Sequence, residues 1–145
     1  MEIINIAASD IPACAAPFMA AYNKMPWNYK WQLPKAIQYL TEYALSPKFV
    51  GFAVVNGPVV SGALLGHTKT WWTGTQFMID ELFVDPTIQG KGYGKLLLEK
   101  AEQYARDNNI TTLTLMTNKF MPAMQFYNKH DFNRVDQYTF MFRQL

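Results

Sequence analysis

Apolar side chains recur at steps of three and four residues in four segments of the chain. This spacing places them on one face of a helix. Helices are therefore predicted to begin near Ser9, at Pro34, at Tyr93 and at Pro122. Proline stands in the first turn of three of them, Pro12 in the first, because its missing amide hydrogen costs no helical bond there. The first helix is expected to end near Met25–Pro26 and the third at Arg106.

Six other segments alternate between apolar and polar residues, or are rich in β-branched and aromatic residues, as strands are. They are Ile3–Ile6, Phe49–Val55, Val59–Thr70, Phe77–Val84, Thr112–Met116 and Val135–Phe142. The turn sequence Asn56-Gly57-Pro58 joins the second and third in a hairpin, and a turn at 71–75 leads to the fourth. We therefore expect an α/β domain in which three consecutive strands are antiparallel.

The composition is that of one folded domain. The chain has 145 residues, of which 50% are hydrophobic, 15% aromatic and 17% charged, which is enough apolar surface to offset the entropy of ordering it. Its 13 basic and 11 acidic residues leave a formal net charge of +2. Because this balance provides no broad basic face, nucleic acid is not expected as a partner.

The N-terminus and the few cysteines and histidines bear on compartment and metal content. The first residues lack the basic and apolar stretches of a secretory signal, and no apolar run nears the roughly 20 residues that cross a bilayer. The single Cys14 cannot form an internal disulfide, and His67 and His130 have no companions with metal-like or triad-like spacing. A cytoplasmic protein with no membrane segment and no metal is expected.

The segment from Phe83 to Lys95 carries the most specific chemical signal, because it runs from a strand through Gly90, Gly92 and Gly94 into a helix. Such a loop can point several backbone N–H groups at one anion, and the helix dipole adds to the attraction. A dinucleotide fold needs this loop after its first strand, and a P-loop needs Gly-Lys-Ser/Thr, so neither motif fits. The glycines alone leave phosphate binding and a ligand-free connection equally open.

The order of the elements and the residues of this segment resemble the GNAT superfamily of acetyl-CoA-dependent N-acetyltransferases over nearly the whole chain. The superfamily's signature is Arg or Gln, two residues, Gly, one residue, and Gly or Ala, and it is matched by Gln89, Gly92 and Gly94. Downstream, Ala123 and Tyr127 match its Ala-x-x-x-Tyr helix. The resemblance identifies the chain as a member of this superfamily.

The resemblance implies one N-acetyltransferase domain over residues 1–145, with flanking helices on a mixed, mostly antiparallel sheet that splays into a cleft after its fourth strand, at Val84. It also implies acetyl-CoA as cosubstrate and direct attack by an amine, without a covalent enzyme intermediate or a metal. The implied coenzyme contacts are Leu82, Phe83, Val84, Gln89, Gly90, Lys91, Gly92, Tyr93, Gly94 and Lys95. Two departures concern the last helix, where Phe120 replaces a frequent asparagine and Asp131 replaces a usual glycine.

Three residues are candidates for proton transfer. The resemblance places the hydroxyl of Tyr127 near the coenzyme sulfur as the acid, and the alternative is a core tyrosine. Asp80 and Glu81 are adjacent in an otherwise apolar strand, where a carboxylate is costly unless it reaches a cleft or a partner, so one is expected to be the base. Both could act on one amine only if a bulge brought them to one face. The alternative for either is a solvated charge or a salt bridge.

Two predicted loops hold the four tryptophans, Trp27, Trp31, Trp71 and Trp72, and are expected on the acceptor side of the cleft. Aromatic walls suit a cationic amine through cation–π contacts. Alternatively, these residues pack the helices on the sheet or bury a contact in a homodimer. The sequence Met25-Pro26-Trp27-Asn28 resembles a loop of small-molecule GNAT members related to aminoglycoside acetyltransferases.

The expected function is acetyl transfer from acetyl-CoA to a primary amine of a small molecule. Retention of Asp80, Glu81 and Tyr127 favours an enzyme, and the tryptophan-rich loops favour a small acceptor over a peptide groove. Two alternatives stay open at this point. They are acetylation of a protein N-terminus or lysine, and a non-catalytic module that senses acyl-CoA.

Overall fold

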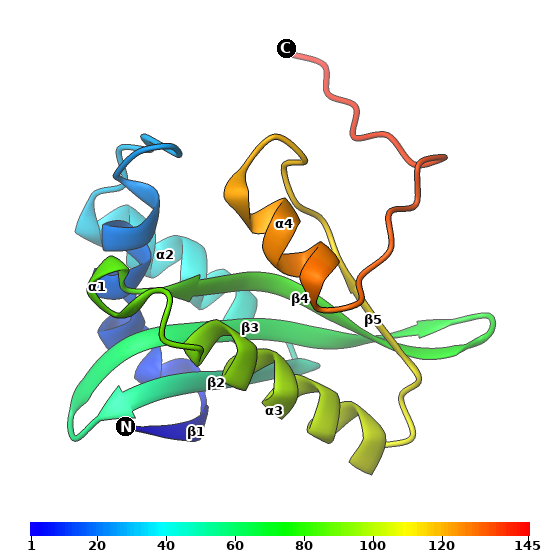
Figure 1. Ribbon diagram of the computed structural model, residues 1–145, viewed down its shortest axis with the longest axis horizontal. Helices are drawn as coiled ribbons and strands as arrows, with labels where there is room; N and C mark the ends of the chain where they lie inside the picture. The colour runs from blue at the N-terminus through cyan, green and yellow to red at the C-terminus, as the bar shows by residue number, and fades with distance from the viewer.

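The structure, a computed structural model, describes residues 1–145 and is built on one five-stranded sheet (Figure 1). The strands lie in chain order: β1 (Glu2–Ile6), β2 (Phe49–Asn56), β3 (Val59–Trp71), β4 (Gly74–Val84) and β5 (Thr112–Leu115). Neighbouring strands are antiparallel except β4 and β5, which are parallel. This confirms the predicted α/β class and the run of antiparallel strands.

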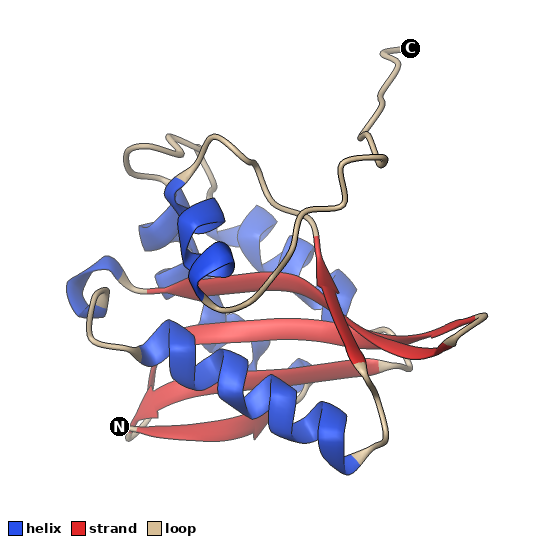
Figure 2. Ribbon diagram, turned by 45° about the vertical axis from the view of Figure 1, so that its right-hand side comes forward, coloured by secondary structure: helices blue, strands red, loops and turns tan.

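Helices cover both faces of the sheet (Figure 2). On one face lie α1 (Ile11–Tyr22) and α2 (Leu33–Ala44), and their buried residues form one core cluster with alternate residues of β2, β3 and β4. On the other lie α3 (Tyr93–Asp107) and α4 (Pro122–Lys129), which share a second cluster with the intervening residues of the same strands. Because side chains alternate along the strands, successive residues contribute to two cores, one on each face of the sheet.

The β3–β4 hairpin is longer than the sequence pattern predicts. Its pairing continues as far as Trp71 opposite Gly74, so the predicted turn at 71–75 is largely strand. The hairpin consequently projects past the rest of the sheet, at the right of Figure 1.

The sheet opens between its two parallel strands. Only Gln76–Ile79 of β4 pairs with β5, and the last partners are Ile79 and Leu115. From Asp80 to Val84, β4 has no strand on that side, while the chain beyond β5 leads to α4. The splayed cleft predicted from the family resemblance is therefore present, but it begins after Ile79 rather than after Val84.

The C-terminal segment corrects one prediction. Residues 135–142 are not a strand: they leave α4 as an extended, irregular segment that runs away from the sheet (Figures 1 and 2). Val135, Tyr138 and Phe142 are exposed, so their alternation does not bury one face. The physical reason is that alternation prescribes a face but not a partner strand, and no sheet edge pairs with this segment.

Two shorter elements complete the chain. A 3-10 turn, η1 (Ala8–Asp10), precedes α1, and a second one, η2 (Pro86–Ile88), precedes the glycine loop. None of the helices combines the length and the apolar character needed to span a membrane.

Candidate active site

A cavity of about 530 Å³ lies at the opening of the sheet. One wall comes from α1, the loop that follows it, and α2, and the floor comes from β4 between Ile79 and Leu82. The opposite wall comes from residues 115–118, at the end of β5 and directly after it, and from Ala123 and Tyr127 of α4. Elements far apart in the chain thus meet around one hollow.

A β-bulge brings both candidate carboxylates to this cavity. In the β3–β4 ladder, Leu65 pairs with Glu81 and the next residue, Gly66, pairs with Ile79, so Asp80 is the extra residue. Gly66 permits the close approach, because a Cβ there would lie 2.6 Å from the carbonyl oxygen of Met78. Both carboxylates therefore turn to the face covered by α1 and α2, and both line the cavity.

Glu81 is held by two tyrosines from two different helices. The hydroxyl of Tyr22, at the end of α1, donates to Oε2 of Glu81 at 3.2 Å, and the hydroxyl of Tyr39 in α2 donates to Oε1. Burial raises the pKa of Glu81 from 4.5 to about 7, although both tyrosine hydrogen bonds favour the carboxylate and lower it. A carboxyl group with this pKa can exchange a proton near neutral pH.

Asp80 has a different partner. Its Oδ2 lies 2.6 Å from Nδ1 of His67 on β3. Burial raises the pKa of Asp80, and the hydrogen bond and charge of His67 oppose that rise. The expectation that His67 has no acid–base companion is therefore wrong, because the bulge moves Asp80 next to it in a way that strand alternation does not foresee.

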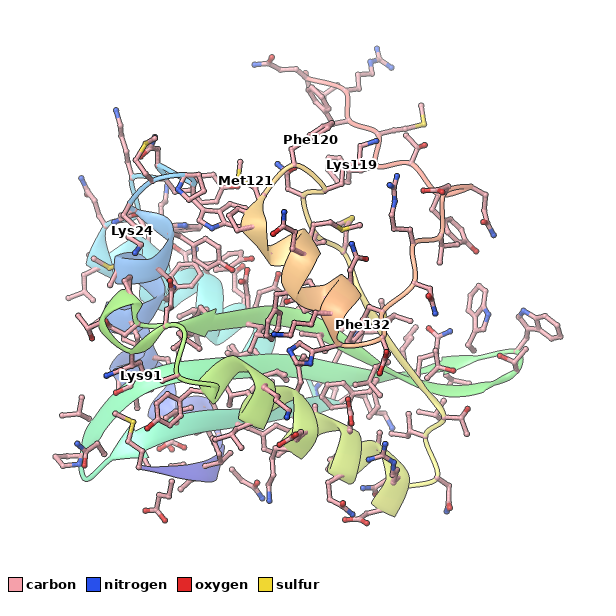
Figure 3. All side chains as sticks on the ribbon, in the orientation of Figure 1. Lys24, Lys91, Lys119, Phe120, Met121 and Phe132 are labelled. Carbon is pink, nitrogen blue, oxygen red and sulfur yellow. The ribbon has the colours of Figure 1, made fainter.

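Tyr127 projects from α4 into the same cavity and is nearly buried. Its ring packs edge-on against Phe126 and against Phe132, with centroids 5.3 and 5.5 Å away. Phe132 lies just beyond the end of α4 in Figure 3. Burial, reinforced by the charge of Glu81, raises the pKa of Tyr127, so its hydroxyl stays protonated and available as a donor at physiological pH.

The glycine loop has the geometry of an anion cradle. Gly90 and Gly92 take left-handed φ angles of 77° and 88°, and α3 begins directly after Gly92. The backbone amides of residues 90–92 donate to no protein atom, and the first-turn amides of the helix have no intrahelical acceptor. Nε2 of Gln89 donates to the carbonyl of Val84 at 3.0 Å and so ties the loop to the end of β4. These residues fit a pyrophosphate group.

Charge and space around the loop agree with this fit. Lys91 stands in the loop itself (Figure 3), and Lys95 follows in the first turn of α3, where it pairs weakly with Glu99 at 3.6 Å. A side chain at position 94 would crowd the ring of Phe126, 3.2 Å away, so glycine lets α3 and α4 approach each other. Phe120, in the position of the missing asparagine, is exposed in the loop before α4 (Figure 3).

The tryptophans separate into two groups. Trp27 and Trp31 line the cavity with Tyr29, and the loop that carries them is closed by two 2.8 Å hydrogen bonds between Asn23 and the backbone of Trp31. Trp71 and Trp72 instead sit at the end of the β3–β4 hairpin, exposed and outside the cavity. The expectation that the fold brings these two to the acceptor side is wrong, because continued strand pairing carries the hairpin away from the cleft.

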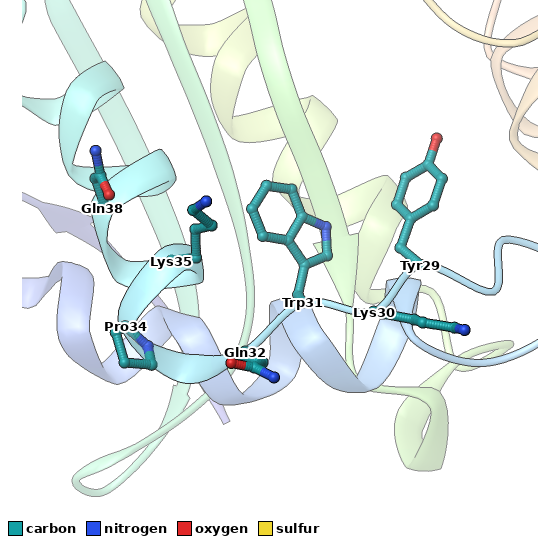
Figure 4. A pocket seen from close by; sticks show the side chains of 7 residues that line it. All are labelled: Tyr29, Lys30, Trp31, Gln32, Pro34, Lys35 and Gln38. Atoms are coloured by element: carbon teal, nitrogen blue, oxygen red, sulfur yellow. The ribbon is translucent and has the colours of Figure 1, made fainter.

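A second hollow, of about 690 Å³, is lined by the start of α2 and by the end of the aromatic loop, as we call residues 23–32 between α1 and α2 (Figure 4). It shares Tyr29 and Trp31 with the first, and its charged residues are Lys30 and Lys35. It contains no carboxylate and no proton-transfer candidate, so the chemistry is assigned to the cavity at the sheet opening. No cluster of three or more His, Cys, Asp or Glu residues is present that could hold a metal ion.

Comparison with protein families matches residues 15–132 to the acetyltransferase (GNAT) family. The chain belongs to this family. Membership confirms the resemblance drawn from Gln89, Gly92 and Gly94. Members of the family use acetyl-CoA as the acetyl donor.

Individual relatives extend the comparison. A 55-residue stretch is 42% identical to the uncharacterized protein YxbD of Bacillus subtilis strain 168, over 37% of this chain and 34% of that protein. The match thus spans only about a third of that relative. An aminoglycoside acetyltransferase from an uncultured soil metagenomic sample, in complex with trehalose, has a TM-score of 0.77 at 18% identity over 99% of this chain and 95% of that one.

Two further solved structures have the same architecture. An integron cassette protein from the mobile metagenome of V. cholerae has a TM-score of 0.81 at 17% identity, over 99% of this chain and 91% of that one. A ribosomal-protein-alanine N-acetyltransferase from Brucella melitensis has a TM-score of 0.78 at 14% identity, over 99% of this chain and all of that one. At these identities the likeness shows the fold.

Sequence reasoning missed the two tyrosines that hold Glu81. Tyr22 falls at helical spacing on the buried face of α1, and Tyr39 lies among apolar residues of α2, so both look like core residues in the sequence. The signal that could have found them is the unpaired carboxylate itself. A carboxylate such as Glu81 that is partly removed from water requires hydrogen-bond donors, and tyrosines on the covering helices can supply them.

Proposed function

We propose that the protein transfers an acetyl group from acetyl-CoA to the primary amine of a small molecule by direct attack. The observation that carries this proposal is Glu81, a partly buried carboxyl group with a pKa near neutrality that lines the same cavity as Tyr127, at the opening of the sheet. The cavity offers the two proton-transfer groups that aminolysis of a thioester needs.

Glu81 takes the role of general base. An ammonium group entering the cavity meets its carboxylate against the rings of Tyr22 and Trp27. Glu81 accepts the proton and leaves a neutral nitrogen with its lone pair free to attack, while the two tyrosine hydrogen bonds hold the carboxylate in one orientation. Asp80, bonded to His67, adds negative charge to the same wall and favours entry of a cation.

Tyr127 takes the role of general acid. Acetyl-CoA supplies a thioester whose carbonyl carbon accepts the amine and whose sulfur leaves. The hydroxyl of Tyr127 donates a proton toward that sulfur, and the second proton that the attacking nitrogen loses as it becomes an amide restores the tyrosine hydroxyl. The amide and the free thiol are then both neutral, and Glu81 returns the first proton to solvent. The unpaired edge of β4 from Leu82 to Val84 offers backbone N–H groups for the developing oxyanion and for the pantetheine arm. The amides and lysines of residues 89–95 hold the pyrophosphate.

The small acceptor is supported by the aromatic lining of the cavity. The rings of the aromatic loop and of α2 line one side, and residues 115–118 with α4 line the other, so one small amine could contact apolar and aromatic side chains on both sides. The soil metagenome relatives with this fold include an aminoglycoside acetyltransferase in complex with sisomicin, a small polyamine, although identity there is only 17%. A protein N-terminus or lysine is the competing acceptor.

The deciding experiment incubates the purified chain with acetyl-CoA and each of a set of small amines, amino acids and alanine-initiated peptides. Released thiol is measured, and the acetylated product is identified by mass. We expect thiol release that depends on a small amine and yields an N-acetyl product. Faster acetylation of the peptides than of the small amines would show that the acceptor is a protein N-terminus or lysine. Tight binding of coenzyme without release for any amine or peptide would contradict acetyl transfer and favour a sensing module.

A further inference from the structure

The acceptor side of the cavity is predominantly apolar and aromatic. Thirteen of the seventeen lining residues are hydrophobic, and the wall beside Glu81 is a run of touching rings. Tyr22 packs against Trp27 with centroids 5.2 Å apart and stacks on Tyr29 at 6.1 Å with only 18° between the planes. Phe18 continues the wall inward, 5.3 Å from Trp31. Rings in this arrangement offer faces to an apolar body and to a cation at its end.

The charge in the cavity is sufficient for one ammonium group. Asp80 and Glu81 are the only charged residues among those that line it. The carboxylate of Asp80 is already bonded to His67, which leaves Glu81 as the carboxylate without a basic partner. A ligand with several ammonium groups would have to bury the others against rings, where an unpaired charge is strongly disfavoured.

The mouth of the cavity is also mainly apolar and carries few hydrogen-bonding side chains. Met116 and Phe140 line it and are both largely exposed, and Tyr29 is half exposed on the opposite rim. The uncharged polar side chains of the lining, apart from the tyrosines, are Thr117 and Asn118. A ligand rich in hydroxyl groups would exchange its water for few hydrogen-bond partners here, whereas an apolar ligand would cover side chains that now face water.

From these three observations we infer that the acceptor is a primary monoamine with an apolar, preferably aromatic, body, and not a polycation or a polyhydroxylated amine. The ammonium lies at Glu81, and the body lies between the ring wall of Tyr22, Trp27 and Tyr29 and the side formed by Leu115 and Met116. This inference rests on the proposed transfer of acetyl groups to small amines, and it names the class of amine.

The test compares amines that differ in one property at a time. 2-Phenylethylamine and hexylamine carry one ammonium and an apolar body, ethanolamine carries one ammonium and a hydroxyl, and spermidine and sisomicin carry several ammonium groups. Thiol release from acetyl-CoA gives kcat/KM for each. We expect 2-phenylethylamine to exceed ethanolamine by about 100-fold, with spermidine and sisomicin no better than ethanolamine. Equal or higher kcat/KM for any of the three hydrophilic amines would overturn the inference.

A matched pair of variants locates the effect. Trp27→Leu removes a ring of the wall, and we expect it to raise KM for 2-phenylethylamine by about tenfold while kcat and the KM for acetyl-CoA stay the same. Trp72→Leu removes an exposed ring at the end of the hairpin, and it should change the KM neither for 2-phenylethylamine nor for ethanolamine. If Trp27→Leu fails to fold by circular dichroism, Tyr29→Leu replaces it, since Tyr29 is half exposed. A KM that neither Trp27→Leu nor Tyr29→Leu alters would contradict the assignment.

Binding measurements separate this inference from the proposed function. Calorimetric titration of the protein, saturated with CoA, with 2-phenylethylamine and with ethanolamine reports recognition without turnover. Tighter binding of 2-phenylethylamine, with no thiol released from acetyl-CoA, would uphold the inference and refute the proposed reaction. Rapid acetylation of sisomicin together with weak binding of 2-phenylethylamine would uphold the proposed reaction and refute the inference about the class of amine.

Discussion

The two halves of the site are built in different ways. The coenzyme loop is a run of consecutive residues, 89–95, and it offers mainly backbone amides and a helix terminus, with side chains that are mostly exposed. The acceptor cavity is assembled from α1, α2, β4 and α4, and it depends on side chains such as Glu81, Tyr39 and Tyr127 that are far apart in the sequence. Backbone recognition tolerates many side chains, whereas side-chain recognition can be changed by one substitution.

This difference explains how one fold serves many acceptors. A cradle of amides at a helix N-terminus fits any pyrophosphate and needs little besides glycines at two left-handed positions. The acceptor half is set by the aromatic loop and by whatever the covering helices present to β4. We therefore expect substitutions in the cavity to affect the rate or the choice of amine, and substitutions in the loop to affect coenzyme affinity.

The largest effect is expected for Glu81→Gln, which should lower kcat by about 10²- to 10³-fold, because it removes the general base. The pH profile sharpens the test. In the wild type, kcat/KM for an amine of high pKa should rise with pH through about 7, where Glu81 loses its proton, and then level off. In the variant it should keep rising up to the pKa of the amine, because only the neutral amine can then react.

The control for this prediction is Asp80→Asn, which keeps Glu81 and removes the neighbouring carboxylate. Because the charge of Asp80 raises the pKa of Glu81, the rise in the profile should move to lower pH in this variant. If Glu81→Gln kept the pH profile of the wild type and Asp80→Asn lost the rise of kcat/KM with pH, the base would be Asp80 instead.

The next largest effect is expected for Tyr127→Phe, with kcat lower by about 10²-fold and the affinity for acetyl-CoA little changed. The ring stays, so its packing on Phe126 and Phe132 is preserved. Loss of a hydroxyl costs on the order of 1 kcal/mol of stability when it is hydrogen-bonded, so the cost here should be no larger, and a folded domain tolerates it. Phe126→Leu is a matched control that disturbs packing beside the hydroxyl but keeps it. Full activity of Tyr127→Phe would leave water or the amine as the proton donor.

The same contrast between local and assembled features governs what the sequence could predict. The glycine loop, the antiparallel run and the helices that begin at prolines were predicted correctly, because each depends on neighbouring residues. The partners of Glu81 were not, since Tyr22 and Tyr39 are 59 and 42 residues away from it. The pairing of His67 with Asp80 depends on a bulge, and the extended course of residues 135–142 depends on the absence of a partner edge, neither of which a periodic pattern encodes.

On the coenzyme side, Gly92→Glu should weaken acetyl-CoA binding by more than about tenfold, because it places a carboxylate in the anion cradle and strains a left-handed position. Gly57→Glu is a matched control. Gly57 also has a positive φ, 58°, and open space for a Cβ, but it lies in the turn between β2 and β3. Calorimetry with CoA should separate the two variants, and an equal loss in both would show that strain, rather than the cradle, decides affinity.

The smallest expected effect concerns Tyr39→Phe, which keeps the base but removes one of its two hydrogen bonds. The Tyr39 hydroxyl stabilises the charged form of Glu81, so its loss should raise the pKa of that carboxyl further and move the rise in the pH profile to higher pH. Activity at pH 6 should then fall several-fold while activity at pH 9 is nearly unchanged, a pattern that a simple packing defect would not produce.

Tyr43→Phe is the matched control, because the Tyr43 hydroxyl lies 3.0 Å from that of Tyr39 and does not contact the carboxylate. An equal displacement of the profile in both variants would mean that the two helices, rather than one hydroxyl, set the pKa of Glu81.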